Sequence, residues 1–297
     1  MRKIIKKLGY QPSHAARMLM RQRTDTIAVI FPEIESPFYA ELLAGIDQAA
    51  EESHYHILTA FVHRGRTAQE LVLRFVQERR VDAAIYLNMQ SNLTGTVKNV
   101  LRSGLPLVLL DRFMDKVPCV TIDNLAGARL AVEHLLACGH RRIAFQQGPT
   151  DNFDAAQRLA GVRAALTRAG VPLEPCLNWL GDFSEEGGMA AVKAWAASGR
   201  PWPDAILTCN DTMAFGVLMA LRELGVKVPG QVAVMGFDDA QGARWLGLTT
   251  IRVPRRELGI HAAHMALSLA RGEKPDPFAI CLPVQLVVRQ TCGRVAG

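Results

Sequence analysis

AILTCNDTMAFGVLMALRELGVKVPGQVAVMGFDD (residues 205–239) contains two apolar runs with one helical pattern between them. The runs AILTCN (205–210) and VAVMGFD (232–238) are nearly continuous in apolar residues, as expected for parallel strands that are covered on both faces. Residues 212–225 carry apolar side chains at helical spacing. This order predicts a βαβ unit, in which the helix returns the chain so that both strands run in the same direction.

The same alternation extends outward through most of the chain. Further strands are expected at TIAVIFP (26–32), HILTAFV (56–62), VDAAIYL (81–87), LPLVLLD (105–111), CVTID (119–123), RRIAFQQG (141–148) and NWLGD (178–182). Helices are expected near residues 38–53, 67–79, 93–103, 126–138, 155–169 and 185–198, the first of them after an N-cap serine and a first-turn proline at Ser36-Pro37. The pattern predicts an α/β fold with two doubly wound parallel-sheet subdomains of about 100–130 residues each.

The size and composition support a globular protein with two compact units. The chain has 297 residues, of which 49% are hydrophobic and 21% charged, which excludes a disordered tail and a collagen-like fibre. The longest apolar runs are broken by proline or charge well before the roughly 20 residues of a membrane span, and the N-terminus lacks the features of a signal peptide. The six cysteines are scattered without a C-x-x-C pair, so neither structural zinc nor a disulfide framework is expected. We therefore expect a cytoplasmic protein with no membrane association.

Positive charge is concentrated at the N-terminus. Residues 1–24 contain no acidic group and seven basic ones, namely Arg2, Lys3, Lys6, Lys7, Arg17, Arg21 and Arg23. Since the whole chain has 34 basic and 28 acidic residues, the other 273 residues carry 27 basic and 28 acidic groups, a net charge of −1. A basic arm on a nearly neutral globule is suited to contacts with nucleic-acid phosphates. The alternative is a solubilising tail.

Polar residues end several of the predicted strands. They are the pairs Asp111-Arg112, Asp123-Asn124, Asn210-Asp211 and Asp238-Asp239, together with the loop 148–152 that leads to Arg158. Ligands of open parallel sheets bind at the carboxyl ends of strands. Carboxylates, amides and a guanidinium, with Phe38, Tyr39 and Phe183 to cover an apolar face, suit a polyhydroxylated ring. The alternative role of such Asp and Asn side chains is helix capping, which we expect of Asn124 and Asp211.

Five segments in order resemble the lac-repressor/galactose-repressor family of bacterial transcription regulators. They are LGYQPSHAARML (8–19), ARLAVEHLLACGHRRIAF (128–145), GPTDNFDAAQRLAGV (148–162), residues 209–239 of the opening stretch, and LTTIRVPRRELG (248–259). The resemblance covers essentially the whole chain. It implies a core related to type I periplasmic sugar-binding proteins, a homodimer formed through that core, and a small effector between the subdomains.

The resemblance also implies the domain organisation. Three crossovers near residues 124, 252 and 284 make each subdomain discontinuous. The expected parts are residues 1–24 as the remnant of a DNA-binding headpiece with a short hinge helix, 25–124 plus 253–284 as the N-terminal effector-binding subdomain, and 125–252 plus 285–297 as the C-terminal one.

Effector contacts follow from the resemblance residue by residue. The positions that match the family's contacts are Phe38, Tyr39, Asp111, Arg112, Asn152, Arg158, Phe183, Asn210, Asp211 and Asp238. They are among the residues chosen from the strand ends and the aromatic positions, and Asn152 lies with Asp154 at loop positions that vary with the effector, which makes their role weaker. Arg158 and Asp238 are the leading candidates.

The DNA-binding side departs from the family pattern. Family members begin with a helix-turn-helix of about 40 residues, whereas Met1 of this sequence falls in what resembles the last headpiece helix. Either the sequence begins at an internal methionine of a longer gene or base readout has been lost, and both interpretations stay open. The candidate DNA contacts are Ser13, His14, Arg17 and Leu19, with Leu19 as the minor-groove wedge and Arg17 on phosphate.

Two other function classes compete with a regulator. The sequence contains no G-x-S-x-G, G-x-x-x-x-G-K-[ST] or H-E-x-x-H motif and no G-x-G-x-x-G after a strand, so we expect no enzyme activity, no cofactor and no metal. The favoured function is a ligand-responsive DNA-binding transcription regulator, a repressor, that senses a small sugar or sugar derivative. The alternative is a stand-alone or extracytoplasmic sugar-binding protein without operator-specific DNA binding.

Overall fold

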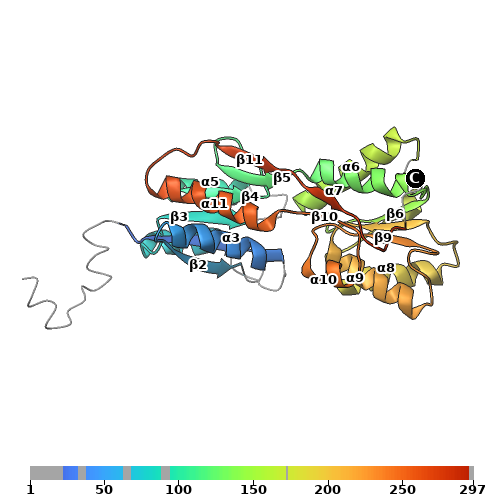
Figure 1. Ribbon diagram of the computed structural model, residues 1–297. Coiled ribbons are helices and arrows are strands. Elements are labelled where there is room, and N and C mark those ends of the chain that lie inside the picture. Colours follow the sequence, from blue (N-terminus) through green and yellow to red (C-terminus); the bar gives the residue numbers. More distant parts are fainter. Residues whose placement is uncertain (1–22, 33–37, 63–67, 88–93, 172, 294–297) are drawn as a thin grey trace, which may run out of the picture.

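The apolar strands form two sheets with helices on both faces, in a computed structural model that describes residues 23–32, 38–62, 68–87, 94–171 and 173–293 (Figure 1). The larger sheet has six strands in the order β11-β5-β4-β3-β1-β2, and every neighbouring pair is parallel. Its strands are β1 (Thr26–Phe31), β2 (His56–Phe61), β3 (Ala83–Leu87), β4 (Leu107–Leu110), β5 (Cys119–Ile122) and β11 (Ala279–Leu282). With its helices α3 (Phe38–Glu52), α4 (Ala68–Gln77), α5 (Thr94–Arg102) and α11 (Arg255–Ala270) it forms what we call the first lobe.

The two faces of this sheet are covered by different helices. Ile27, Val29 and Phe31 of β1 pack in the same apolar cluster as residues of α3 and α11. Ala28 and Ile30 point to the other face and pack with residues of α4 and α5. Successive side chains of a strand point to opposite faces, so a strand covered on both sides must be apolar at every position.

The smaller sheet has four strands in the order β7-β6-β8-β9, again parallel. Its strands are β6 (Ile143–Gln146), β7 (Asn178–Trp179), β8 (Ala205–Thr208) and β9 (Ala233–Met235). The helices of this second lobe are α6 (Asn124–Ala137), α7 (Phe153–Arg168), η1 (Pro175–Leu177), α8 (Glu185–Ala197), α9 (Asp211–Glu223) and α10 (Gln241–Trp245). One face packs with α6 and α7 and the other with α8 and α9.

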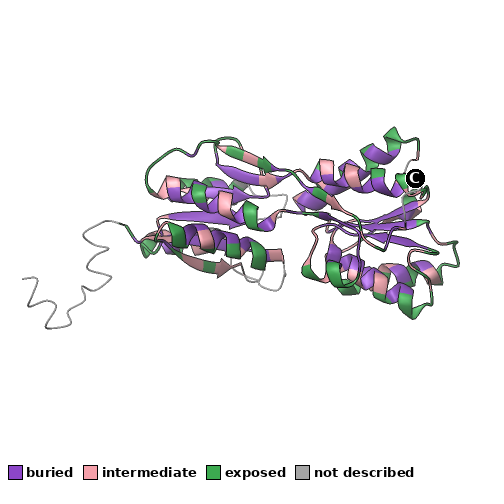
Figure 2. Ribbon diagram, viewed as in Figure 1, coloured by how far each residue is buried: buried purple, intermediate pink, exposed green. Residues whose placement is uncertain are grey.

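The chain crosses between the lobes three times. It leaves the first lobe between β5 and α6, returns between β10 (Thr250–Arg252) and α11, and leaves again between β11 and β12 (Gln285–Val287). β10 and β12 form an antiparallel pair against which α6 packs. Figure 1 shows the lobes side by side with these connections between them, and Figure 2 shows buried strands at the centre of each lobe.

Glycines allow two helix pairs to cross closely. A side chain on Gly45 of α3 would meet the backbone carbonyl of Arg256 in α11, and one on Gly259 of α11 would meet the carbonyl of Leu42 in α3. The α8–α9 crossing has the same arrangement at Gly188 and Gly216. At both crossings the backbones approach to a distance that a methyl group would prevent.

The predicted α/β fold with two parallel-sheet lobes and three crossovers is confirmed, and most boundaries agree within two or three residues. β7 is shorter than expected, with only Asn178 and Trp179 in the ladder. The predicted cap at Ser36-Pro37 and the hinge helix lie outside the described residues. Within the part of the chain that the structure describes, no helix is long and apolar enough to cross a membrane.

Candidate functional site

The carboxyl ends of strands from both sheets bring four charged side chains together between the lobes. Asp111 follows β4 of the first lobe, and Asp238 follows β9 of the second. Asp154 and Arg158 lie on the first two turns of α7. The charges of Asp154, Arg158 and Asp238 all act on Asp111, which places the four side chains within electrostatic reach of one another. We call them the interlobe cluster.

Arg158 is the centre of this cluster and is only 5% exposed. Its Nη2 lies 3.2 Å from Oδ1 of Asp238, and Nη1 donates to the backbone carbonyl of Cys209 at the end of β8 (2.6 Å). Its Nε donates to Oδ1 of Asn124 (2.8 Å), and the guanidinium stacks 3.8 Å over the ring of Phe237. All three nitrogens and one face of the guanidinium thus have partners, which fix its position.

Asp154 shares Asn124 with Arg158. The amide Nδ2 of Asn124 donates to Oδ1 of Asp154 at 2.9 Å, so this one amide links the two charged side chains. Burial raises the pKa of Asp154 to about 6, and the positive charge of Arg158 opposes that rise. The Asp154 carboxyl therefore titrates close to neutral pH.

Asp111 is buried without a hydrogen-bond donor. It is 4% exposed, and neither carboxylate oxygen has a hydrogen-bond partner among the described residues. Its backbone adopts a left-handed conformation with φ of 56°, which is uncommon outside glycine. Burial raises the pKa of Asp111 well above its ordinary value, and the negative charges of Asp154 and Asp238 raise it further. Such a group costs stability and is typical of a ligand site.

Aromatic rings and an arginine surround the cluster. Phe183 also has a positive φ, of 69°, and its ring packs so closely on Gly148 that a side chain there would clash with it. The guanidinium of Arg112 lies 4.3 Å from the ring of Phe153. Phe183 lies in the loop after β7, as expected from the strand ends, whereas Phe153 is the first residue of α7.

The remaining predicted residues have structural contacts. Asn152 caps α7, accepting from the backbone N–H of Ala155 (2.9 Å). Tyr39 points into the first lobe, where its ring lies 5.1 Å from that of Phe31. Phe38 lies at the lobe boundary, 5.6 Å from the guanidinium of Arg255.

The expectation that Asn124 and Asp211 cap helices is wrong. The caps are the preceding residues: Asp123 accepts from the N–H of Ala126 at the start of α6, and Asn210 accepts from that of Met213 at the start of α9. Asp211 is instead fully buried and accepts from the hydroxyl of Thr250 (2.6 Å) and the N–H of Ala240 (2.7 Å). It holds the loop after β9 in place.

Arg255 is a buried residue of this region that the sequence does not predict. It is 4% exposed, begins α11 and binds both carboxylate oxygens of Glu41 in α3 (3.0 and 3.2 Å). It also donates to the backbone carbonyls of Asp238 (2.7 Å) and Asp239 (3.0 Å). Arg255 therefore ties the first lobe to the loop that carries Asp238. No local pattern reveals it, because its partners come from segments far apart in the sequence.

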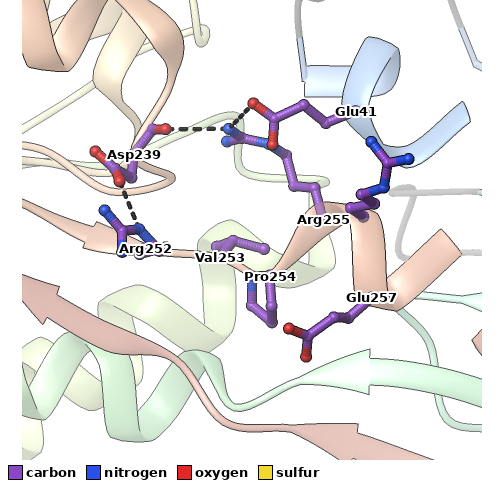
Figure 3. Close-up of a pocket in the computed structure, with 8 residues that line it drawn as sticks. Glu41, Asp239, Arg252, Val253, Pro254, Arg255 and Glu257 are labelled. Atoms are coloured by element: carbon purple, nitrogen blue, oxygen red, sulfur yellow. Dashed lines mark hydrogen bonds and ion pairs between the residues drawn. The ribbon is translucent and has the colours of Figure 1, made fainter. Parts of the chain in front are cut away.

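A cavity of about 240 Å³ lies beside Arg255 (Figure 3). It is lined by Glu41, Asp239 and the continuous segment from Arg252 to Glu257. Figure 3 shows the Arg255 guanidinium directed at Glu41 and the Arg252 side chain at Asp239. The cavity borders the second crossover rather than the interlobe cluster. Among the described residues, no three His, Cys, Asp or Glu side chains are placed to hold a metal ion.

Known proteins that are similar to this chain belong to one family of regulators. The family model of periplasmic binding proteins and the sugar binding domain of the LacI family matches residues 24–288. The HTH-type transcriptional regulator CelR of Thermobifida fusca is 32% identical over 98% of this chain and 88% of that protein. The ribose operon repressor of Escherichia coli K12 is 33% identical over 86% of this chain and 78% of that protein.

Solved structures agree in fold. A complex of the transcriptional regulator CelR with cellobiose has a TM-score of 0.81 at 30% identity, covering 98% of this chain and 89% of that one. The lac repressor dimer bound to operator and the anti-inducer ONPF has a TM-score of 0.84 at 28% identity, covering 98% of this chain and 88% of that one.

Proposed function

This chain belongs to the LacI family, and from that premise we propose that it is a transcription regulator, a repressor, whose DNA binding responds to a small sugar or sugar derivative held between the two lobes. The interlobe cluster carries the proposal. It joins Asp111 of the first lobe to Arg158 and Asp238 of the second through charge. A ligand that binds these groups contacts both lobes at once.

The chemistry of the cluster favours a polyol. The carboxylates accept hydrogen bonds from hydroxyl groups, the guanidinium of Arg158 holds Asp238 in position, and the half-buried ring of Phe183 offers an apolar face. Similar proteins are associated with sugars: CelR has a solved complex with cellobiose, and other relatives are ribose operon repressors.

Regulation follows from the three crossovers. A ligand that contacts both lobes stabilises the arrangement in which they are close, and a ligand shifts such an equilibrium by its difference in affinity for the two states. We propose that the N-terminal basic segment contacts DNA, that two copies of the chain act together as a homodimer, and that the protein works in the cytoplasm, where its DNA is. It needs no cofactor for this role and is not an enzyme.

The test selects genomic DNA fragments on the purified product of the complete gene and then titrates hexoses, pentoses and disaccharides into the complex. We expect enrichment of a palindromic fragment and at least about a tenfold change of its affinity with one sugar, a coupling of ~1.4 kcal/mol. Asp238→Asn should weaken that sugar by about 1–3 kcal/mol, whereas Asp115→Asn, at an exposed position, should not.

Two outcomes contradict the proposal. Stabilisation by sugars without enrichment of any DNA fragment favours the stand-alone binding protein. Stabilisation by amino acids or nucleobases alone removes the sugar assignment.

A further inference from the structure

The interlobe cluster contains more negative than positive charge. Asp111 and Asp154 are buried carboxyl groups, Asp238 is a partly buried one whose side chain is 14% exposed, and Arg158 is the cation that lies among them. Arg112 acts on Asp154 and Arg255 on Asp238 from outside the cluster. Arg158 makes its ion pair with Asp238, its Nε donates to the amide oxygen of Asn124, and its Nη1 donates to the backbone carbonyl of Cys209. Asp111 therefore receives no hydrogen bond from this cation.

Among the described residues, the charged groups that act on Asp111 are Asp154 and Arg158 from α7 and Asp238 from the loop after β9. Two of these three carry negative charge when ionised. The neighbouring Arg112 lies over the ring of Phe153 and acts on Asp154. Both oxygens of Asp111 remain without a hydrogen-bond donor in this environment.

A ligand has to supply what the protein does not. A neutral diol satisfies the two oxygens of Asp111, but when the carboxyl is ionised this ligand leaves its negative charge uncompensated in a buried site, and such a charge is costly. An anionic ligand adds repulsion. A cationic donor such as an ammonium group supplies the hydrogen bonds and the missing charge together.

We propose that the effector is a polyol with a protonated amine, of the amino-sugar class, and that its ammonium group binds the Asp111 carboxylate. The inference rests on the proposed function and goes beyond it, because it assigns a charge and a point of attachment to the effector. Asp111 is then the residue that separates amino sugars from their hydroxyl counterparts.

Calorimetric titration of the full chain with matched sugars tests this. The probes are D-glucosamine, D-galactosamine and D-mannosamine, each against its parent hexose, with D-gluconate as the anion, at about pH 6.5 where the amines are protonated. We expect one hexosamine to bind at least about tenfold more tightly than its parent hexose, which equals ~1.4 kcal/mol.

Variants separate a role of Asp111 from a general effect. Asp111→Asn keeps the shape of the side chain and removes its charge, and it should reduce the preference for the amine to about onefold to threefold, ~0.7 kcal/mol or less. Asp115→Asn makes the same change of charge at an exposed position four residues away and should leave the preference intact.

The outcomes distinguish this inference from the proposed function. If a neutral hexose binds as tightly as its amine, or if Asp111→Asn keeps the preference, the inference is overturned while sugar sensing stands. If no hexosamine or hexose binds, the inference is overturned and the enriched DNA fragment alone supports a regulator.

Discussion

At Asp111 the structure keeps a carboxyl group where an uncharged side chain would be more stable. In the unfolded chain this carboxyl ionises with a pKa of about 3.9, and burial raises that pKa in the folded protein. The folded state therefore binds the Asp111 proton more tightly than the unfolded state does. The free energy of unfolding then falls as the pH rises from the unfolded pKa towards the folded one.

Asp111→Asn is accordingly expected to stabilise the fold at pH 8 by about 1–3 kcal/mol, because the amide has no charge that burial disfavours. The difference should shrink as the pH falls to about 3, below the unfolded pKa, where the native carboxyl is mostly protonated in both states. Urea unfolding of both proteins across this range measures it. A variant that is less stable than the native protein at pH 8 would show that Asp111 has a structural partner.

Arg158 has the opposite character, because its charge is fully compensated. Arg158→Met should destabilise the fold by about 3–5 kcal/mol, since Asp238 is left buried without its partner. Adding Asp238→Asn should recover part of that loss. Arg129→Met removes an exposed pair with Glu133 and should change stability by less than about 0.5 kcal/mol. Equal losses for Arg158→Met and Arg129→Met would contradict this account.

The sequence predicts some of these residues and not others for physical reasons. Asp111 and Asp238 were found because they follow apolar strands, and the carboxyl ends of strands face the ligand. The sequence does not show which of Asn210 and Asp211 caps α9, since either residue type can cap a helix. Only the backbone conformation decides which side chain accepts from the first N–H groups of the helix. Arg255 was out of reach because its partners meet only in the folded chain.

At the scale of elements, the close crossing of α3 and α11 depends on a residue without a side chain. Gly259→Ala should destabilise the first lobe by about 1–3 kcal/mol, because a methyl group there would meet the carbonyl of Leu42. Gly95→Ala in α5 meets no atom within 4 Å and should instead stabilise the protein by up to ~1 kcal/mol. Thermal unfolding of the two variants compares them, and equal shifts would contradict the packing argument.

Strands that are buried on both faces were predictable, and the antiparallel pair β10–β12 was not. Strands β1 and β8 were predicted because both of their faces are buried, and a strand buried on both faces is a continuous apolar run. The antiparallel pair β10–β12 has no such run, because it includes the exposed pair Arg252 and Gln285. Its position follows from the crossovers rather than from local propensity.

At the scale of the whole molecule, large apolar side chains remain exposed on α9 and α10. Trp245 is 74% exposed on α10, and Met219 is 52% exposed on the neighbouring α9. We expect this surface to contribute to the homodimer. Trp245→Glu should weaken dimerisation by about 2 kcal/mol or more, as removal of a central aromatic anchor does.

Sedimentation at micromolar concentration measures the change. Leu180→Glu places the same charge at a site that is 71% exposed in the same lobe, outside these two helices, and should leave the dimer intact. If Trp245→Glu remains as dimeric as the native protein, the interface lies on another face.

The three crossovers have a consequence for synthesis on the ribosome. The first lobe begins at β1, yet α11, which covers one face of its sheet, spans Arg255–Ala270, and its edge strand β11 ends at Leu282. Nearly the entire polypeptide must therefore leave the exit tunnel before that lobe can close. Until then the apolar faces of β1 and α3 that α11 covers are accessible to chaperones and to other nascent chains. A pause in translation before residue 255 would therefore expose more apolar surface than a pause at any later codon.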